Sequence, residues 1–511
     1  MTKTTTLSWI GFCLSLMFAL LFARVVFVNL VMGGHFRDLA ENNTIRREKV
    51  VQSRGNIYDR NGKQLAVNIE NEGRTVRFYP YGEVLAGVLG YTGKIDEPSL
   101  KKCKNDCDGE TEIGKMGLEK YYQAELVGKP GEVIIEEKAT GETRAKFFQQ
   151  GGEEGKNITT NIDADWQKTA FVSLREKLKE VGKSGAVVVT KVSGEVLVLV
   201  SAPSFDNNLF INNGKRSDFG GDYKSVADLL LAEESKPLFN RAISGDFAPG
   251  SVYKILPAIA GLQEKKINED SSIVDTGEIK IGEYRFGNWY LDKYGKTDGD
   301  VNVTKAIARS NDIFFYKLGE QLGVDLLVSW SKKMGLGDYT NIDLPGEGKG
   351  LLPTPYWREK NLGERWFLGN TYHLSIGQGD LMSTPMQINR MTAAIISGKK
   401  CEPRLVGKGN CVDVGLNEEN RKIVLRGMEK ACSPEGTAFP LFSYAGKIYC
   451  KTGTAQKGGK ETVSNAWISV VVPKGEKMDD WFVVTVLVEE GGEGSAVAAP
   501  IAKDLMPMLL K

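Results

Sequence analysis

The stretch SGAVVVTKVSGEVLVLVSAP, residues 184–203, decides the fold class. Its two apolar, β-branched runs flank a Ser193-Gly194 turn, and this pattern predicts two antiparallel strands. Three more strand-like segments, GKIYCKTGTAQ, NAWISVVVP and DWFVVTVLVEE, follow one another near the C-terminus with short polar connections. Such connections favour an antiparallel sheet, here with strands from both ends of one domain.

Helices are expected around this sheet. The segment ITTNIDADWQKTAFVSLREKLKEVG predicts an amphipathic helix before the first strand, and AAPIAKDLMPMLLK predicts a closing helix that packs back on the sheet. The helical stretches between residues 250 and 400 predict an all-helical lobe. The expected class over residues 161–511 is therefore α+β, with an antiparallel sheet flanked by helices plus this lobe.

The segment LSWIGFCLSLMFALLFARVVFVNLVMGG predicts a transmembrane anchor over residues 7–32, after a cytoplasmic tail of residues 1–6. A spanning helix needs about 20 mostly apolar residues, which this segment supplies if Arg24 reaches a membrane interface. No small-residue cleavage pattern follows, so the anchor is expected to stay. The flanking charges would place the large part in the cytoplasm, but long domains translocate largely regardless of such charges.

Residues 33–160 predict an irregular, β-rich pedestal. NIYDRNGKQLAV predicts a hairpin around an Asn61-Gly62 turn, and GLEKYYQAELVG is the one helical segment expected there. Six of the seven cysteines lie outside the anchor, which allows three disulfides or free thiols. Cys401 and Cys411 flank a short loop and form the favoured pair.

The composition argues against several classes of function. The chain has 66 basic and 65 acidic side chains, a formal net charge of +1, without the basic excess typical of nucleic-acid-binding proteins. His35 and His373 are its two histidines. A His-rich metal site or a Ser-His-Asp triad is therefore hard to build.

FAPGSVYKILPAIAGL, residues 247–262, places Ser251 at the start of a predicted helix and Lys254 on the same helix face. The Ser-x-x-Lys motif alone does not single out this pair, because it recurs in Ser99-Lys102, Ser329-Lys332 and Ser397-Lys400.

Two further elements favour the pair at Ser251. ARSNDIFFYKLGEQLG carries Ser310, Asn311 and Asp312 at the start of a predicted helix, and YCKTGTAQ carries the chain's one Lys-Thr-Gly. Ser-x-x-Lys, Ser-x-(Asn/Asp) and Lys-Thr-Gly in this order are typical of penicillin-binding proteins and serine β-lactamases.

These residue types suit acyl transfer. A serine hydroxyl is a weak nucleophile, and Lys254 can act as its base if the lysine pKa falls from about 10.4 towards 7–8. Lys451 would supply a neighbouring cation and hold a substrate carboxylate, and Ser310 can pass a proton to a leaving amine. Gly453 permits close approach of the substrate.

The backbone amides of Ser251 and Thr454 are expected to form an oxyanion hole. Each element also has a structural interpretation: Ser251 could cap one helix, and Ser310 or Asp312 could cap the next. Any one element alone favours that interpretation. All three in order favour the catalytic one.

The chain resembles the class B penicillin-binding proteins, which are membrane-anchored peptidoglycan transpeptidases, almost from end to end. RGNIYDRNGKQLA and IGKMGLEKYYQAELVGKPG resemble their N-terminal signatures, and NRAISGDFAPGSVYK, YHLSIGQGDLMSTPMQ and KTGTAQ resemble their transpeptidase landmarks. LAENN and Asp312 are most similar to the elongation type. The resemblance implies the penicillin-binding transpeptidase fold behind a dimerisation-type module, without metal or cofactor.

The resemblance also implies site roles. Ser251 corresponds to the acylated serine, Lys254 to its base, and Ser310 with Asp312 to the second motif. The third motif binds the terminal carboxylate of the substrate and completes the oxyanion hole, and it corresponds to Lys451, Thr452, Gly453 and Thr454.

The implied reaction is a two-step transfer during cell-wall elongation. Ser251 attacks a D-Ala-D-Ala stem peptide and releases D-Ala, and an amine of a neighbouring strand then takes the acyl group. The implied partners are stem peptides, β-lactams and a multipass polymerase of glycan strands with other elongation proteins, and no nucleic acid. The implied location is the plasma membrane, with a single span and the catalytic domain outside the cytoplasm.

Other functions stay open. A serine β-lactamase shares the motifs but needs a base for water, a β-lactam sensor needs a cytoplasmic effector domain, and a silent scaffold or a division-type transpeptidase would keep the sequence pattern. Two residues also conflict with the expected site. An ionised Asp312 beside Lys254 raises the pKa of that lysine, so Lys451 must outweigh it or Asp312 must face elsewhere. Pro257 bends its helix unless it lies in the first turn.

Overall fold

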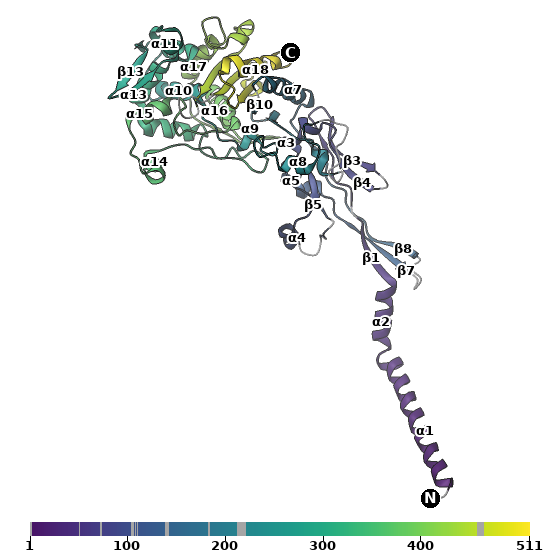
Figure 1. Cartoon of the computed structure of the whole chain (residues 1–511). Helices are drawn as coiled ribbons and strands as arrows, with labels where there is room; N and C mark the ends of the chain where they lie inside the picture. Colours follow the sequence, from purple (N-terminus) through teal and green to yellow (C-terminus); the bar gives the residue numbers. More distant parts are fainter. Residues whose placement is uncertain are drawn as a thin grey trace. The chain divides into compact units, whose positions relative to one another are not determined.

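The structure is a computed structural model. It describes residues 3–50, 52–71, 74–103, 107, 109, 111–137, 143–181, 184–211, 221–456 and 464–511. The chain forms two compact units (Figure 1). The first contains residues 1–55 and 127–156, and the second contains residues 56–126 and 157–511.

The first unit begins with the helix α1 (Lys3–Val26), which continues through a π-helical turn, η1 (Phe27–Val31), to α2 (Gly33–Thr44). Leu7–Val31 is the one helix of the described chain that is long and apolar enough to cross a membrane. Arg24 lies in the last turn of α1. A helix that suits the predicted anchor is therefore present, while residues 1 and 2 of the expected tail lie outside the described residues.

A small antiparallel sheet completes the first unit. Its strands are β1 (Ile45–Val50), β7 (Gly131–Glu137) and β8 (Thr143–Gln150), in the order β1-β7-β8. Each strand pairs antiparallel with its neighbour, so β7 lies in the centre.

The second unit is built on a five-stranded antiparallel sheet, which confirms the fold class predicted from residues 184–203. Its order is β11-β10-β20-β19-β18, and each strand is antiparallel to its neighbours. The five strands are β10 (Gly185–Lys191), β11 (Val196–Ala202), β18 (Tyr449–Ala455), β19 (Asn465–Val472) and β20 (Phe482–Val488). The Lys-Thr-Gly motif lies on β18, at one edge of the sheet.

Helices cover both faces of this sheet. α7 (Ala164–Val181) and α18 (Ala499–Leu509) pack on one face, where Ile468 and Val470 of β19 are buried. Trp467 and Val471, which flank this pair and point the opposite way, face the helical lobe on the other side. This alternation follows from the two-residue period of a strand. The predicted closing helix thus packs on the sheet.

The helical lobe surrounds α10 (Ile255–Gln263), which shares a buried core with several other helices. These are α12 (Val303–Arg309), α13 (Asp312–Lys333), α15 (Leu368–Ser375), α16 (Pro385–Ser397) and α17 (Glu418–Ala431). The rest of this unit contains short pieces, including the antiparallel strand pairs β12-β15, β13-β14 and β16-β17, which the sequence did not predict. These pieces are η4 (Asn207–Phe210), α8 (Val226–Leu230), α9 (Arg241–Ser244), η5 (Gly250–Lys254), β12 (Ser272–Asp275), β13 (Glu278–Ile281), β14 (Tyr284–Gly287), α11 (Trp289–Tyr294), β15 (Gly299–Asn302), α14 (Pro355–Leu362), β16 (Lys399–Cys401), β17 (Cys411–Asp413), η6 (Phe439–Tyr444), η7 (Met478–Asp480) and η8 (Gly494–Ala498).

Residues 56–126 pack on the same sheet. Ile57, Leu65 and Leu118 share a core with Val188 and Leu199 of β10 and β11. The predicted Asn61-Gly62 hairpin is present, with Gly62 at a φ of 84°. The expectation of one helical segment here is wrong, because the region folds into β2 (Ile57–Tyr58), β3 (Gln64–Asn71), β4 (Arg74–Phe78), η2 (Gly82–Val84), α3 (Ala86–Leu89), β5 (Thr92–Lys94), α4 (Glu97–Cys103), β6 (Glu112–Gly114), α5 (Gly117–Tyr121) and α6 (Gln123–Leu126), with β9 (Ile158–Thr159) beside β2.

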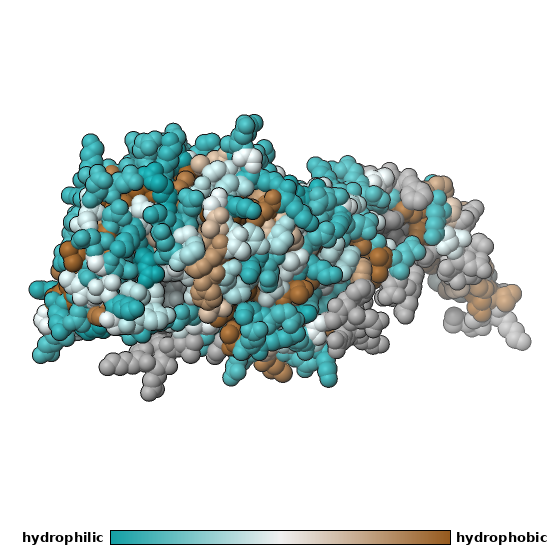
Figure 2. Space-filling model, turned by 90° about the horizontal axis from the view of Figure 1, so that it is seen from above, coloured by the Kyte–Doolittle hydropathy of each residue, from teal (hydrophilic) through white to brown (hydrophobic). Residues whose placement is uncertain are grey.

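The surface of the second unit is largely hydrophilic on the face that Figure 2 shows, with small, separate apolar areas. Three disulfides lie in this unit, Cys103–Cys107, Cys401–Cys411 and Cys432–Cys450. The second of them confirms the favoured pair. The third ties the end of α17 to β18, one residue before Lys451.

The Cys432–Cys450 bridge is expected to contribute substantially to stability. Its sequence separation is 18 residues, and closing a loop of this size stabilises by about 3 kcal/mol. Replacing both cysteines by alanine should lower the melting temperature by about 5 °C in a thermal scan. Adding a reductant should lower the wild-type value towards that of the double variant, and an unchanged melting temperature in the variant would contradict the expectation.

Candidate active site

Ser251 lies on a short 3₁₀ turn, η5, which leads directly into α10. No side chain caps this turn, so the interpretation of Ser251 as a helix cap is wrong. Because α10 proper begins at Ile255, Pro257 falls in its first turn and is compatible with a straight helix. Gly250 has a φ of 56°, and a Cβ there would lie 2.7 Å from the carbonyl oxygen of Thr454. The turn that carries Ser251 therefore packs directly on β18.

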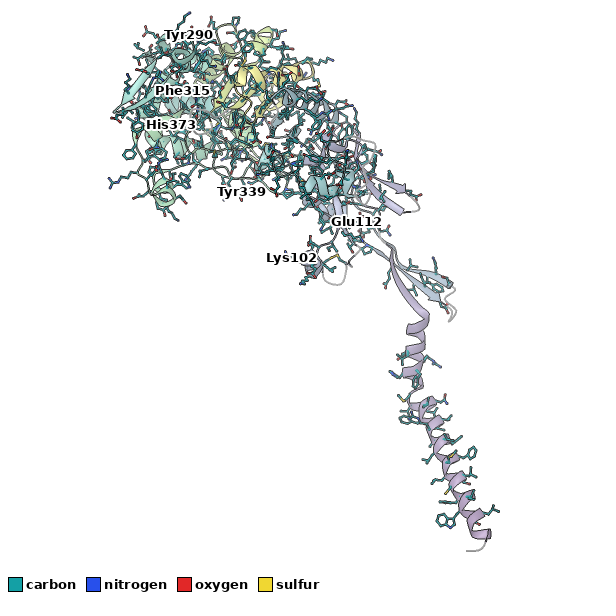
Figure 3. All side chains as sticks on the ribbon, in the orientation of Figure 1. Lys102, Glu112, Tyr290, Phe315, Tyr339 and His373 are labelled. Atoms are coloured by element: carbon teal, nitrogen blue, oxygen red, sulfur yellow. A yellow bond between two sulfur atoms is a disulfide. The ribbon has the colours of Figure 1, made fainter. Side chains whose placement is uncertain are left out.

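Burial separates Lys254 from the other Ser-x-x-Lys lysines. Its side chain is fully buried, with the Nζ atom 5.5 Å from the ring centroid of Phe315. Lys102 and Lys332 are exposed, and Lys400 is half-buried. Figure 3 shows Lys102 in α4, well away from Phe315. Burial also lowers the pKa of Lys400, but of the four pairs only that at Ser251 has a fully buried lysine.

Lys254, Ser310 and Lys451 converge on one point. The Nζ atom of Lys254 donates to the backbone oxygen of Ser310 at 2.8 Å and approaches its Oγ at 3.3 Å. The Nζ atom of Lys451 donates to the same Oγ at 2.8 Å and to the backbone oxygen of Thr452 at 2.9 Å. The hydroxyl of Ser310 thus lies between the two amines. Ser251, half-buried, makes no side-chain hydrogen bond with the described residues.

The second motif joins two helices. Ser310 ends α12 in the left-handed conformation, with a φ of 55°. Asn311 caps α13, because its Oδ1 accepts from the N–H of Phe314 at 2.9 Å. The interpretation in which Ser310 or Asp312 caps this helix is therefore wrong. Asp312, the first residue of α13, points its carboxylate at Lys254, with 2.7 Å between Oδ1 and Nζ.

The third motif packs closely against η5. A Cβ on Gly453 would lie 3.0 Å from the backbone nitrogen of Val252, so a larger residue would push β18 away from the turn that carries Ser251. The hydroxyls of Thr452 and Thr437 form a hydrogen bond of 2.7 Å. The Oγ1 atom of Thr454 accepts from the N–H of Gly494 at 3.3 Å. Thr437 and Gly494 carry no sequence signal that would have identified them.

Burial controls the charge of both lysines. It lowers the pKa of Lys254, although the adjacent carboxylate of Asp312 acts in the opposite direction. Burial, followed by the charge of Lys254, holds the pKa of Lys451 well below its usual value. Asp312 does face Lys254, but the desolvation of the Lys254 amine lowers its pKa by more than the carboxylate of Asp312 raises it. The cluster therefore favours a neutral amine, which a general base requires.

Two neighbours of Asp312 were missed in the sequence. The N–H of Trp289 donates to Oδ2 of Asp312 at 3.3 Å. The N–H of Asp312 donates to Oδ1 of Asn288, also at 3.3 Å. Asn288 and Trp289 belong to no recognisable motif, and they approach Asp312 only because α11 folds back on the start of α13.

Comparisons with protein families agree with this geometry. A model of the penicillin-binding protein transpeptidase domain matches residues 184–507, and a model of the penicillin-binding protein dimerisation domain matches residues 68–160. The peptidoglycan D,D-transpeptidase MrdA of Acinetobacter baumannii is 32% identical over 75% of this chain and 57% of its own length. MrdA of Escherichia coli is 31% identical over 86% of this chain and 72% of its own. The peptidoglycan D,D-transpeptidase FtsI of Escherichia coli is 25% identical over 89% of this chain and 70% of its own length.

Solved structures of the same family superpose well. PBP2 of Pseudomonas aeruginosa, in complex with WCK 5153, has a TM-score of 0.76 and 32% identity, covering 90% of this chain and 96% of its own. PBP2 of Helicobacter pylori, in complex with MreC, has a TM-score of 0.77 and 26% identity, and the match covers 91% of this chain and 98% of the other. A chain of a peptidoglycan synthase complex has a TM-score of 0.80 and 26% identity, and the match covers 99% of this chain and 98% of the other.

The greater similarity to MrdA than to FtsI confirms the expected elongation type. Together with the fold, the anchor and the three motifs in one place, it identifies the family. This chain belongs to the penicillin-binding protein transpeptidases, the family of peptidoglycan D,D-transpeptidases, and within it to the MrdA or PBP2 type.

Proposed function

We propose that the chain cross-links peptidoglycan stem peptides during cell-wall elongation by acyl transfer through Ser251. The observation that carries this proposal is the meeting of Lys254 and Lys451 on the hydroxyl of Ser310, with both amines fully buried. No metal or cofactor takes part in the steps below.

In the first step, Oγ of Ser251 bonds to the carbonyl carbon of the penultimate D-Ala of a donor peptide. Its proton passes to Lys254 and, through Ser310, to the nitrogen of the terminal D-Ala, which leaves as the C–N bond breaks. The N–H groups of Ser251 and Thr454 stabilise the negative oxygen of the intermediate, at about 2.7–4 kcal/mol per donor in comparable enzymes.

The third motif holds the donor. Lys451 binds the terminal carboxylate with the hydroxyls of Thr452 and Thr454, and Gly453 leaves room for the peptide backbone. An arriving carboxylate favours the ammonium form of Lys451. The hydroxyl of Ser310, 2.8 Å from Lys451 and 3.3 Å from Lys254, offers a path for that proton. Lys254 is then neutral when substrate is bound.

In the second step, an amine of a neighbouring stem peptide attacks the acyl carbon and gives up a proton. The bond to Oγ breaks and Ser251 regains its hydrogen. A penicillin follows the first step only: its ring C–N bond opens, the nitrogen stays attached to the acyl group, and no amine can reach the ester.

The test is acylation of the detergent-solubilised full chain by benzylpenicillin, followed by intact-protein mass spectrometry. We expect a gain of one drug mass that persists for many minutes. Trypsin should place it on residues 242–254, AISGDFAPGSVYK, which lie between the cleavage sites after Arg241 and Lys254. Rapid return to the free mass with consumption of the drug would instead indicate a β-lactamase. No adduct would favour a silent scaffold.

We also propose that the catalytic domain lies outside the cytoplasm, with residues 1–6 as a cytoplasmic tail, 7–32 as the anchor, 33–160 as the pedestal and 161–511 as the transpeptidase domain. The three disulfides support this location, because such bonds persist in oxidising compartments. Protease added to intact spheroplasts should remove the catalytic domain. Protection until lysis would contradict this orientation.

We propose a multipass polymerase of glycan strands, together with other elongation proteins, as the partner. The similarity to a chain of a peptidoglycan synthase complex and to a PBP2 bound to MreC supports this. The polymerase should co-purify with the full chain from detergent-solubilised membranes. A variant whose residues 7–32 are replaced by an unrelated membrane anchor should lose it, and equal recovery would overturn a role for the anchor.

A further inference from the structure

Asp275, at the end of β12, is a buried carboxylate that the three motifs do not include. Its side chain is 3% exposed. Oδ2 accepts three hydrogen bonds, from Nδ2 of Asn288 at 2.8 Å, from Nδ2 of Asn311 at 2.9 Å and from the N–H of Asp298 at 2.8 Å. Oδ1 accepts from the N–H of Gly277 at 2.8 Å. Four donors from separate parts of the chain thus meet on one side chain.

One branch of this network leads to the catalytic lysine. Asn288 precedes α11 but does not cap it with its side chain. Its Nδ2 is held by Asp275 and its Oδ1 accepts from the N–H of Asp312 at 3.3 Å. The N–H of Trp289 holds Oδ2 of Asp312, whose Oδ1 contacts Nζ of Lys254 at 2.7 Å. Asp275 is therefore connected to Lys254 through Asn288 and Asp312.

A second branch holds the turn that carries Ser310. The Nδ2 group of Asn311 donates to Asp275 and to Oδ2 of Asp298 at 3.1 Å, while its Oδ1 caps α13. All polar atoms of the Asn311 side chain are thereby engaged. The neighbouring Ser310 adopts a left-handed conformation that serine rarely populates, and such a conformation persists when the surrounding structure fixes it.

The charges around both ends of this connection can be named. Asp298 and Arg309 face the Asp275 end, where Nε of Arg309 lies 3.1 Å from Oδ1 of Asp298. The guanidinium of Arg309 also lies 4.6 Å from the ring centroid of Tyr290, a residue of α11 that Figure 3 labels. Asp312 and Lys451 face the Lys254 end.

We propose that Asp275 and Asn288 are positioning residues of the acyl-transfer site, which set the placement of Asp312 and Ser310 and thereby of Lys254. This inference rests on the proposed function. It concerns residues that touch neither the reacting atoms nor the substrate carboxylate, and it assigns the strand pair β12-β15 and the short helix α11 a role in catalysis.

The first test variant is Asp275→Asn. It keeps the side-chain volume, but an amide must present its NH₂ group to at least one of the four donors, so the network loses an acceptor. The rate constant for acylation by benzylpenicillin should fall about 10-fold, since small displacements of catalytic groups cost this much or more. Asn288→Ala should have a similar effect. The acylation rate constant of the double variant should also be about 10-fold, rather than 100-fold, below that of the wild type, because both residues act through Asp312.

The pH profile provides a readout that a purely structural role would not change. Asp312 raises the pKa of Lys254 against the effect of burial. A loosened Asp312 therefore lets this pKa fall, and the rise of the acylation rate with pH should move to lower pH in both variants. Asp312→Asn should move it in the same direction.

Asp343→Asn is the matched control. Asp343 is also fully buried, but its carboxylate accepts from the N–H groups of Leu405 and Val406 and from the hydroxyl of Tyr122. The Asp343→Asn substitution should lower the melting temperature without changing the dependence of the acylation rate on pH. If Asp275→Asn and Asn288→Ala retain the wild-type profile and rate, as Asp343→Asn should, the inference is overturned. If the wild-type protein itself is not acylated, the proposed function fails instead.

Discussion

The Ser251→Ala protein is expected to gain no mass from benzylpenicillin under conditions in which the wild-type chain is fully acylated. The alanine lacks the only atom of that side chain that can bond to the drug. The hydroxyl of Ser310 lies between the two buried amines, but Ser310 is 6% exposed and both amines contact its Oγ, so it is not expected to replace Ser251. The fold should be retained, because Ser251 makes no side-chain hydrogen bond with the described residues and caps no helix. Equal melting temperatures would show this.

Ser244→Ala is the matched control for that experiment. Ser244 lies in the same tryptic peptide, residues 242–254, but its hydroxyl is directed to the backbone oxygen of Gly346. Its replacement should leave the adduct on the same peptide with an unchanged lifetime. An adduct on residues 242–254 of the Ser251→Ala protein, or loss of the adduct in Ser244→Ala, would show that Ser251 is not the acylated serine.

Replacement of Lys254 by methionine is expected to slow acylation by about 10²–10⁴-fold, the usual contribution of a general base. Methionine preserves much of the length and volume of the buried side chain but cannot accept a proton. The wild-type rate should rise with pH through the lowered pKa of Lys254 and then level off, since the neutral amine is the active form. This rise should be absent or displaced in Lys254→Met. Stopped-flow measurement with a chromogenic cephalosporin provides both quantities.

Lys332→Met controls for the loss of a lysine in a Ser-x-x-Lys sequence. Lys332 follows Ser329 with the same spacing, but it is exposed on α13. Its replacement should leave the rate and the pH profile as in the wild type. A loss of less than about 10-fold in Lys254→Met would be too small for a general base and would favour Lys451 as the residue that takes the proton.

The sequence predicted the sheet and the three motifs because both depend on short-range patterns. Apolar, β-branched runs joined by short turns, in residues 184–203 and near the C-terminus, were sufficient for the antiparallel sheet. The order of the motifs was sufficient to select Ser251 from four candidates. Burial of Lys254, by contrast, depends on the whole lobe, and no local pattern distinguishes it from Lys332.

Other features of the site arise from contacts between distant segments. Asp275 is 36 residues from Asn311, which it binds, and Asn288 is 24 residues from Asp312, which it binds. Neither spacing has a periodicity to recognise. The capping role of Asn311 was missed because serine and aspartate beside it are equally good caps. The short helices α5 and α6 were not separated, since elements of one turn carry little hydrophobic pattern.

The position of β18 at the edge of the sheet has a consequence for solubility. An unpaired strand edge can recruit another chain, and proteins usually block it with proline, a bulge or charge. β18 has no proline and pairs with β19 without a bulge, and a peptide substrate can add to just such an edge through main-chain hydrogen bonds. The packing of η5 and α17 against β18 is therefore its protection. Conditions that loosen the lobe would turn the surface that receives substrate into a site of self-association.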